Sequence, residues 1–223
     1  MSASLPERWR WIDERTRADH RFLRPEDHCL YFGEYRARCG WRGGPINDLI
    51  ADFKRSPARI RESAHAPSVE RFKERAIRSV ARARRTGFAR VAVDTQLTFV
   101  PIPPSALAGR SDHCDRLLRA LNLAFAGWQA DIRPLLRQSA ATVPDHARAG
   151  ARSSFAQLLA ITQLDRSQLD RPLRPVVALF DDVITSGKHL AVATYRIREI
   201  LPRQAIISVC IARRVRVEPQ PEA

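Results

Sequence analysis

The sequence predicts an α/β protein with an open, mostly parallel sheet, helices on both faces of that sheet, and a mainly helical N-terminal appendage. Two observations predict this class. From residue 90 onward, short apolar runs alternate with longer stretches whose apolar residues recur at helical spacing. Before that point helical spacing dominates. We therefore expect an appendage over residues 1–87, a core over 88–217 and a disordered tail over 218–223.

The appendage is expected to begin irregularly and to become helical. Residues 1–28 are rich in charge with interspersed aromatics, which indicates a lead-in that packs on the main body. The aromatic residues of 29–56 are expected to pack in the interior rather than to stack on bases. Residues 46–54 have the apolar face of a helix. Residues 68–86 have the same periodicity over a longer stretch, and Ser68 can cap that helix.

The core is expected to alternate strands and helices. Strands are predicted at residues 90–94, 97–102, 176–180 and 205–211. Helices are predicted at residues 115–128 and 189–201, and Pro202 ends the second. Residues 153–161 are compatible with a strand or a short helix.

The charge of the chain favours polyanionic partners. The chain has 38 lysines and arginines against 24 aspartates and glutamates, and only Lys54, Lys73 and Lys188 are lysines. The resulting net charge of +14 suits phosphates, diphosphates or nucleic acid. The clusters Arg82–Arg85 and Arg213–Arg216 could contact a phosphate backbone, although a solvated basic surface is the favoured interpretation of each cluster alone.

The sequence indicates neither a membrane protein nor a disulfide scaffold. No apolar stretch reaches the length of a membrane span, and the N-terminus does not resemble a signal peptide. We therefore expect a cytoplasmic protein. The four cysteines are scattered with no C-x-x-C pair, so we expect neither a disulfide nor a zinc site.

The most informative segment is residues 176–189. An apolar strand, Val176–Phe180, ends in the acidic pair Asp181 and Asp182. The small-residue turn Thr185–Lys188 follows and leads into a helix. A helix N-terminus offers N–H groups to phosphate, and carboxylates accept hydrogen bonds from sugar hydroxyls. This order predicts a site for a phosphorylated sugar. The plain alternative is a core strand that runs into a surface turn.

A P-loop does not explain this segment, and a second loop supports the sugar site. The position five residues before Gly187, which a P-loop would fill with glycine, is Asp182. After the strand at 97–102 comes a proline-rich loop that includes Pro103, Pro104 and Ser105. Prolines stiffen such a loop, which is useful where backbone must face a diphosphate.

Together these motifs resemble the type I phosphoribosyltransferases, and the ComF-like competence-protein branch in particular. The resemblance covers roughly residues 88–215. Two departures stand out. This chain lacks the paired zinc-binding cysteines that usually begin ComF relatives, and it has Lys188 and His189 where the phosphate loop usually ends in a hydroxyl residue. A histidine there could donate to the phosphate or cap the helix.

The resemblance implies a site for 5-phosphoribosyl 1-diphosphate (PRPP). It assigns the ribose hydroxyls and the catalytic role to Asp181 and Asp182, with Mg²⁺ bridging the hydroxyls and the diphosphate. It assigns the 5′-phosphate to a loop made of Thr185, Ser186, Gly187, Lys188 and His189. The candidates for the diphosphate are Pro103, Pro104, Ser105, Arg110 and Arg137.

The expected function is transfer of a phosphoribosyl group from PRPP to a nitrogenous, base-like acceptor, with release of diphosphate. The N-terminal appendage would then form the hood over the site, and a homodimer is a candidate assembly. One alternative is a non-catalytic protein of the same fold that binds single-stranded DNA or a nucleotide in DNA uptake, repair or regulation. Another is a structural partner subunit whose site is vestigial.

Overall fold

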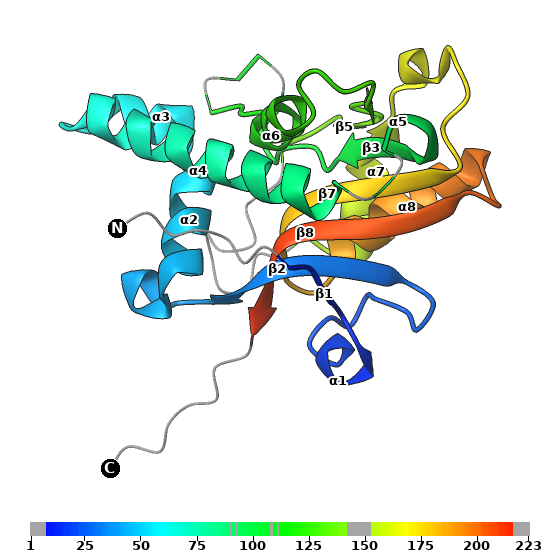
Figure 1. The fold of residues 1–223 in the computed structure, drawn as a ribbon, viewed down its shortest axis with the longest axis horizontal. Helices are drawn as coiled ribbons and strands as arrows, with labels where there is room; N and C mark the ends of the chain where they lie inside the picture. The colour runs from blue at the N-terminus through cyan, green and yellow to red at the C-terminus, as the bar shows by residue number, and fades with distance from the viewer. Residues whose placement is uncertain are drawn as a thin grey trace.

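The main sheet is mixed and almost entirely parallel (Figure 1). The computed structural model describes residues 8–89, 91, 93–107, 109–110, 112–141 and 153–215. Within them the sheet has six strands in the order β1-β2-β8-β7-β3-β4, and only the edge pair β1–β2 is antiparallel. The prediction of an α/β fold with a mostly parallel sheet is confirmed. The strands are β1 (Arg10–Trp11), β2 (His28–Arg36), β3 (Leu97–Pro101), β4 (Asp131–Ile132), β7 (Val176–Ile184) and β8 (Ala205–Val215).

Helices lie on both faces of this sheet. The connections β3–α6–β4 and β7–α8–β8 leave the centre of the sheet in opposite directions, so right-handed crossovers place α6 and α8 on opposite faces. Helices α2 and α4 pack on the α6 side. The main helices are α2 (Pro45–Lys54), α4 (Ala66–Gly87), α6 (Arg116–Ala124) and α8 (Lys188–Ile200). The shorter ones are α1 (Glu14–Arg17), α3 (Pro57–Arg61), α5 (Val93–Gln96), α7 (Phe155–Ile161), and the 3-10 turns Gly40–Gly43 and Arg166–Leu169.

Strand β7 lies at the centre of the sheet, between β8 and β3. Its apolar residues from Val177 to Phe180 are buried on both faces, as the continuous apolar run predicts. The strand extends beyond Phe180 to Ile184, because β8 continues to pair with it through Asp181, Val183 and Ile184. A separate two-stranded antiparallel sheet, β5 (Leu136–Gln138) with β6 (Thr162–Leu164), follows β4 along the chain.

The N-terminal segment contributes an inner strand of the main sheet. Strand β2 pairs in parallel with β8 from His28 to Arg36. Its side chains Tyr31 and Phe32 are buried in the same core as β7. Tyr31, Phe32 and Phe53 therefore lie in the interior as expected, whereas Trp41 is exposed, which the prediction did not foresee. Periodicity did not predict this strand, because β2 is not regularly alternating and its partner lies near the other end of the chain.

Several element boundaries differ from the prediction. A strand was expected over residues 90–94, but the helical turn α5 occupies Val93–Gln96. Residues 90 and 92 of that expected strand lie outside the described part of the chain. Helix α6 ends at Ala124, because the chain turns through Gly127 at a φ of 82°. Residues 155–161 are helical, with Ser154 forming a capping box. Helix α4 begins at Ala66, so Ser68 is not its cap. The tail at 218–223 lies outside the described residues.

The two arginine clusters are not uniform basic surfaces. Arg84 is fully buried, with its guanidinium over the rings of Trp9, Phe32 and Phe180 at 4.7, 4.7 and 4.1 Å. Arg82 and Arg85, its neighbours in the sequence, are exposed. In the second cluster, Arg213 is paired with Asp19 and Glu34. Arg84 is buried because it lies on the side of α4 that faces the sheet, whereas Arg82 and Arg85 do not.

None of the helices in the described ranges combines the length and the apolar character that crossing a bilayer requires.

Candidate functional site

The two acidic residues of the motif lie at the C-terminal end of the central strand, where open parallel sheets place their binding sites. Asp181 and Asp182 are both buried, with 8% and 5% of their surfaces exposed. Each carboxylate accepts a backbone N–H from the next residue at 2.7 Å, which fixes its orientation. The two acids are adjacent in the sequence, but their surroundings differ.

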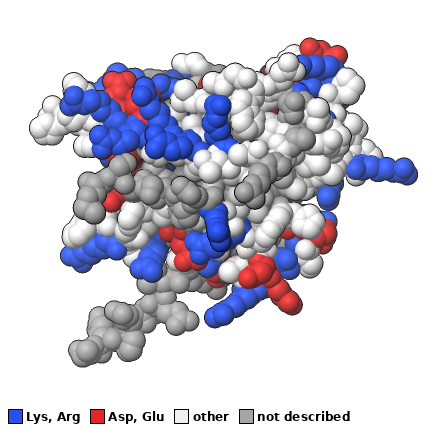
Figure 2. All heavy atoms as spheres, in the orientation of Figure 1, with Lys and Arg blue, Asp and Glu red and all other residues white. Residues whose placement is uncertain are grey.

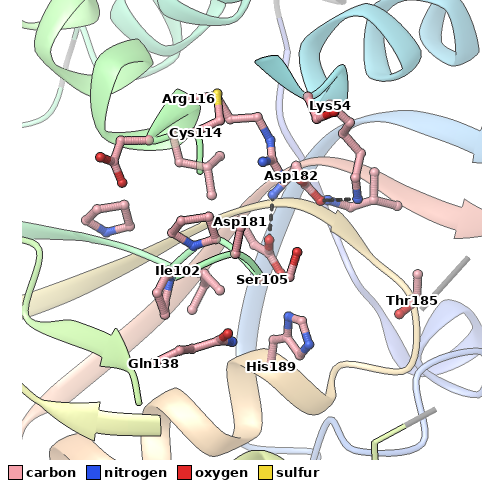
Figure 3. A pocket seen from close by; sticks show the side chains of 18 of the residues that line it. Lys54, Ile102, Ser105, Cys114, Arg116, Gln138, Asp181, Asp182, Thr185 and His189 are labelled. Atoms are coloured by element: carbon pink, nitrogen blue, oxygen red, sulfur yellow. Dashed lines mark hydrogen bonds and ion pairs between the residues drawn. The ribbon is translucent and has the colours of Figure 1, made fainter. Parts of the chain in front are cut away.

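Asp182 is held by two cations from distant elements. Lys54, the last residue of α2, donates to one carboxylate oxygen at 3.0 Å. Arg116, the first residue of α6, donates to the other at 2.5 Å (Figure 3). Burial alone would raise the pKa of Asp182, but Lys54 and Arg116 lower it well below its ordinary value. Asp182 is therefore a fixed anion whose oxygens are already engaged.

Asp181 carries the available carboxylate. Burial and the nearby charge of Asp182 raise its pKa from 3.8 to about 6. His189, on the first turn of α8, and Lys54 oppose this rise. One oxygen of Asp181 accepts the Asp182 N–H, and the other accepts no hydrogen bond from the described residues. At neutral pH this oxygen is an ionised acceptor that a ligand hydroxyl can use.

The turn after β7 has the geometry of an anion-binding loop. Gly187 caps α8 at a φ of 80°, a conformation that favours glycine. A Cβ at this position would lie 3.1 Å from the side chain of Leu23, so the turn is also tightly packed. The first N–H groups of α8 point out of the helix start, where an anion is favoured.

The N-terminal segment braces this loop from behind. The ring of the buried His20 hydrogen-bonds to the Thr185 carbonyl, and the Phe22 N–H donates to the Ser186 carbonyl at 2.9 Å. Lys188 is buried, and its ammonium donates to the Ser153 carbonyl at the start of α7. The Lys188 side chain therefore ties the loop to α7, and the loop offers backbone groups rather than this ammonium.

One cavity of about 1070 Å³ joins these features. Its lining includes Asp181, Asp182 and the loop residues Thr185, Gly187, Lys188 and His189. It also includes the candidates for the diphosphate Pro103, Pro104, Ser105 and Arg137. In Figure 3, Ser105 and His189 both lie below Asp181 in this view. Arg110 and Ser186 are not among the lining residues, so the structure does not bring these two expected residues to the cavity.

His189 does not cap α8, because the cap position is Gly187 and no side chain fills that role. His189 instead lines the cavity near Asp181.

The sequence did not reveal three residues that shape this site: Lys54, Arg116 and His20. Lys54 is one of only three lysines, at the end of a predicted helix, and Arg116 begins another. These positions at helix ends are weak indications of a site, because no local pattern in the sequence predicts that both residues approach Asp182. His20 had no signal at all.

Among the residues that the structure describes, no group of three or more His, Cys, Asp or Glu side chains is arranged to hold a metal ion. Comparison of the chain with models of known families and with curated proteins found no match.

Proposed function

We propose that this cavity binds PRPP and that the protein transfers its phosphoribosyl group to a nitrogenous acceptor. One observation carries the proposal: the left-handed Gly187 turn and the available carboxylate of Asp181 open into the same cavity. A loop suited to a phosphate and an acceptor suited to ribose hydroxyls are thus separated by one short turn. The resemblance of the motif to the phosphoribosyltransferases supports the same ligand.

The charges around Asp182 suit the chemistry of this transfer. The ribose C1 gains positive character as the diphosphate departs, so positioning and charge stabilisation make up most of the catalysis. Asp181 would hold the ribose hydroxyls and place a negative charge near C1. Lys54 and Arg116 offset the charge of Asp182. They engage both oxygens of Asp182, so Asp181 is the carboxylate with an oxygen available to the ligand.

The residues present fit a magnesium ion carried by the substrate. Mg²⁺ is commonly bound through one or two carboxylates together with substrate phosphates. The free oxygen of Asp181 is the carboxylate that this arrangement needs. When bound, Mg²⁺ would neutralise the leaving diphosphate.

Calorimetric titration of the full chain with PRPP and Mg²⁺ tests the proposal. We expect saturable binding and a rise in melting temperature, because a ligand held only by the folded state stabilises it. Gly187→Ala should weaken PRPP binding, since its loop must approach the phosphate. Gly127→Ala is the matched control: its φ of 82° is equally left-handed, and it does not line the cavity. No binding by the wild-type protein at millimolar PRPP would refute the assignment.

A second candidate function, binding of nucleic acid, is favoured by a row of arginines on α4. Arg71, Arg75, Arg78, Arg82 and Arg85 are all exposed and recur at intervals of three and four residues, which places them along one face. Figure 2 shows Lys and Arg gathered where Figure 1 places α3 and α4. No acidic residue occurs between Arg75 and Gly87.

Repulsion between the arginines of this row destabilises the isolated helix, and a bound polyanion would remove that repulsion. Like charges three or four residues apart repel by about 0.2–0.5 kcal/mol per pair. Arg75, Arg78 and Arg82 have no ion pair or hydrogen bond within the described residues that would relieve this repulsion. If the row binds a phosphate backbone, changing these three to Gln should reduce the salt slope of DNA binding by about 3.

The control for this test is an equal change of charge elsewhere. Arg166, Arg198 and Arg203 are also exposed and lie outside α4. Fluorescence anisotropy with a labelled single-stranded oligonucleotide, between low and physiological salt, compares the two triple variants. Equal losses in both would show that only net charge matters, and would remove nucleic acid binding as a specific function of α4.

A further inference from the structure

The wall of the cavity beyond Lys54 carries only positive ionised side chains. This wall consists of the lining residues from Tyr35 to Arg59 together with Arg214. Its charged members are Arg38, Lys54, Arg55, Arg59 and Arg214. The acidic lining residues all come from other segments: Asp112, Asp115, Asp165, Asp181 and Asp182. The wall therefore has no acidic lining residue, whereas the rest of the lining has both signs, with Arg116, Arg137 and Lys188 beside the acidic residues.

Three of these five cations have no partner of opposite charge in the part of the chain that the structure describes. Lys54 is paired with Asp182, and Arg55 with Asp52. For Arg38, Arg59 and Arg214 the described residues provide no ion pair and no side-chain hydrogen bond. The Nε of Arg214 is also shielded from solvent without an acceptor. Unpaired guanidinium groups that line one cavity are expected to attract an anion, because guanidinium pairs well with carboxylate and phosphate.

The wall is held in place rather than loosely attached. The ammonium of Lys73, a buried residue of α4, donates to the Arg55 carbonyl at 2.8 Å and to the Cys114 sulfur at 2.9 Å. It therefore fastens the turn between α2 and α3 to the segment just before Arg116. Ile50, buried at 2% exposure, adds an apolar surface to the same wall.

The position of the wall in the sheet indicates which part of the reaction it serves; this step rests on the proposed function. The candidate diphosphate loop follows β3, on one side of β7, whereas Tyr35 and Arg214 lie on β2 and β8, on the other side. In a displacement at C1 the acceptor enters on the face opposite to the leaving group. A ring nitrogen donates its electron pair to C1, and the C1–O bond breaks with its electrons on the diphosphate. An acceptor whose attacking nitrogen carries a proton passes that proton to the released diphosphate, and a pyridine-type nitrogen becomes a pyridinium.

We infer that the acceptor is a small planar heterocycle that carries a negatively charged group, a carboxylate, and that Arg59 and Arg214 recognise this carboxylate. A neutral ring would leave the shielded Nε of the half-buried Arg214 without an acceptor, and Arg59 adds an exposed guanidinium to the same wall. The apolar surface of Ile50 and the ring of Tyr35 would contact the heterocycle. The inference adds a substrate class to the proposed transfer.

Matched pairs of probes that differ only in the carboxylate test this inference. Pyridine-3-carboxylate is compared with pyridine-3-carboxamide, and uracil-6-carboxylate with uracil. Each probe is titrated calorimetrically into the full chain, with and without saturating PRPP and Mg²⁺, and diphosphate release is followed in parallel. We expect at least one carboxylate to bind about tenfold or more tightly than its neutral counterpart, as a charge-assisted hydrogen bond provides.

Substitutions assign the preference to the wall. Arg59→Gln and Arg214→Gln should each reduce the preference for the carboxylate about tenfold and leave PRPP affinity unchanged. Arg42→Gln is the matched control, because Arg42 belongs to the same segment but does not line the cavity.

The outcomes separate the two proposals. If PRPP binds but no probe shows a preference for the carboxylate at millimolar concentration, the inference is wrong and the proposed function stands. An unchanged preference in both wall variants has the same meaning. If PRPP does not bind, the proposed function is wrong, and the assignment of an acceptor falls with it.

Discussion

Replacing Asp181 by asparagine should stabilise the protein at neutral pH, because it removes a buried negative charge next to another one. In the folded protein, burial and the charge of Asp182 raise the pKa of Asp181 from 3.8 to about 6. One pKa unit corresponds to about 1.36 kcal/mol, so ionised Asp181 costs the fold on the order of 2–3 kcal/mol. An asparagine at this position is neutral at every pH, and its amide oxygen can still accept the Asp182 N–H.

Because the pKa of Asp181 is raised in the folded protein, the stabilisation expected from Asp181→Asn depends on pH. Well below pH 4 the carboxyl of Asp181 is protonated in both folded and unfolded chains, and near pH 4 the unfolded chain has only begun to release the proton, so the substitution should change stability little there. As pH rises toward 6, the unfolded chain releases the proton first, and the wild-type protein loses stability. Above pH 6 the full cost is present, and Asp181→Asn should be about 2–3 kcal/mol more stable than the wild type.

Urea denaturation followed by circular dichroism, at one-unit steps from pH 4 to pH 8, measures this difference. The control is Asp182→Asn, for which the opposite sign is expected. Lys54 and Arg116 lower the pKa of Asp182, so its ionised form stabilises the fold, and neutralising it should destabilise the protein at pH 5 and at pH 8 alike. A gain from Asp181→Asn that is the same at pH 4 and pH 8, or no gain at pH 8, would refute this account of the charges.

Two further substitutions test the packing around the site. Arg84→Met removes a fully buried cation for which the described residues offer no hydrogen-bond acceptor, so we expect a urea midpoint at least equal to that of the wild type. Arg84→Ala should instead cost about 3 kcal/mol by leaving a cavity over the Phe180 ring, and a Met variant as unstable as the Ala variant would contradict the reasoning. Gly187→Ala should cost about 1–2 kcal/mol for its left-handed backbone and more for the contact with Leu23. Gly127→Ala, where a Cβ meets nothing within 4 Å, should lower the melting temperature less, and equal losses would show that Leu23 yields.

The sequence by itself determined the features that depend on neighbouring residues. The apolar run Val176–Phe180 predicted a buried strand, because its residues are apolar on both alternating faces. The acidic pair follows this run, and Gly187 precedes the next helix. Their order along the chain therefore predicted that the acids lie at the end of the strand and Gly187 at the start of the helix. Helices 46–54 and 68–86 were predictable for the same reason, since each buries one face that recurs at helical spacing.

Only the tertiary structure decided which distant elements meet. Lys54 and Arg116 reach Asp182 from 128 and 66 residues away along the sequence. Strand β2 joins the sheet through β8, a parallel pairing that no local pattern encodes. Arg82 and Arg84 have nearly the same neighbours in the sequence, yet one is exposed and the other is fully buried. Burial and charge pairing depend on the side of each element that faces the rest of the molecule, and packing alone fixes that side.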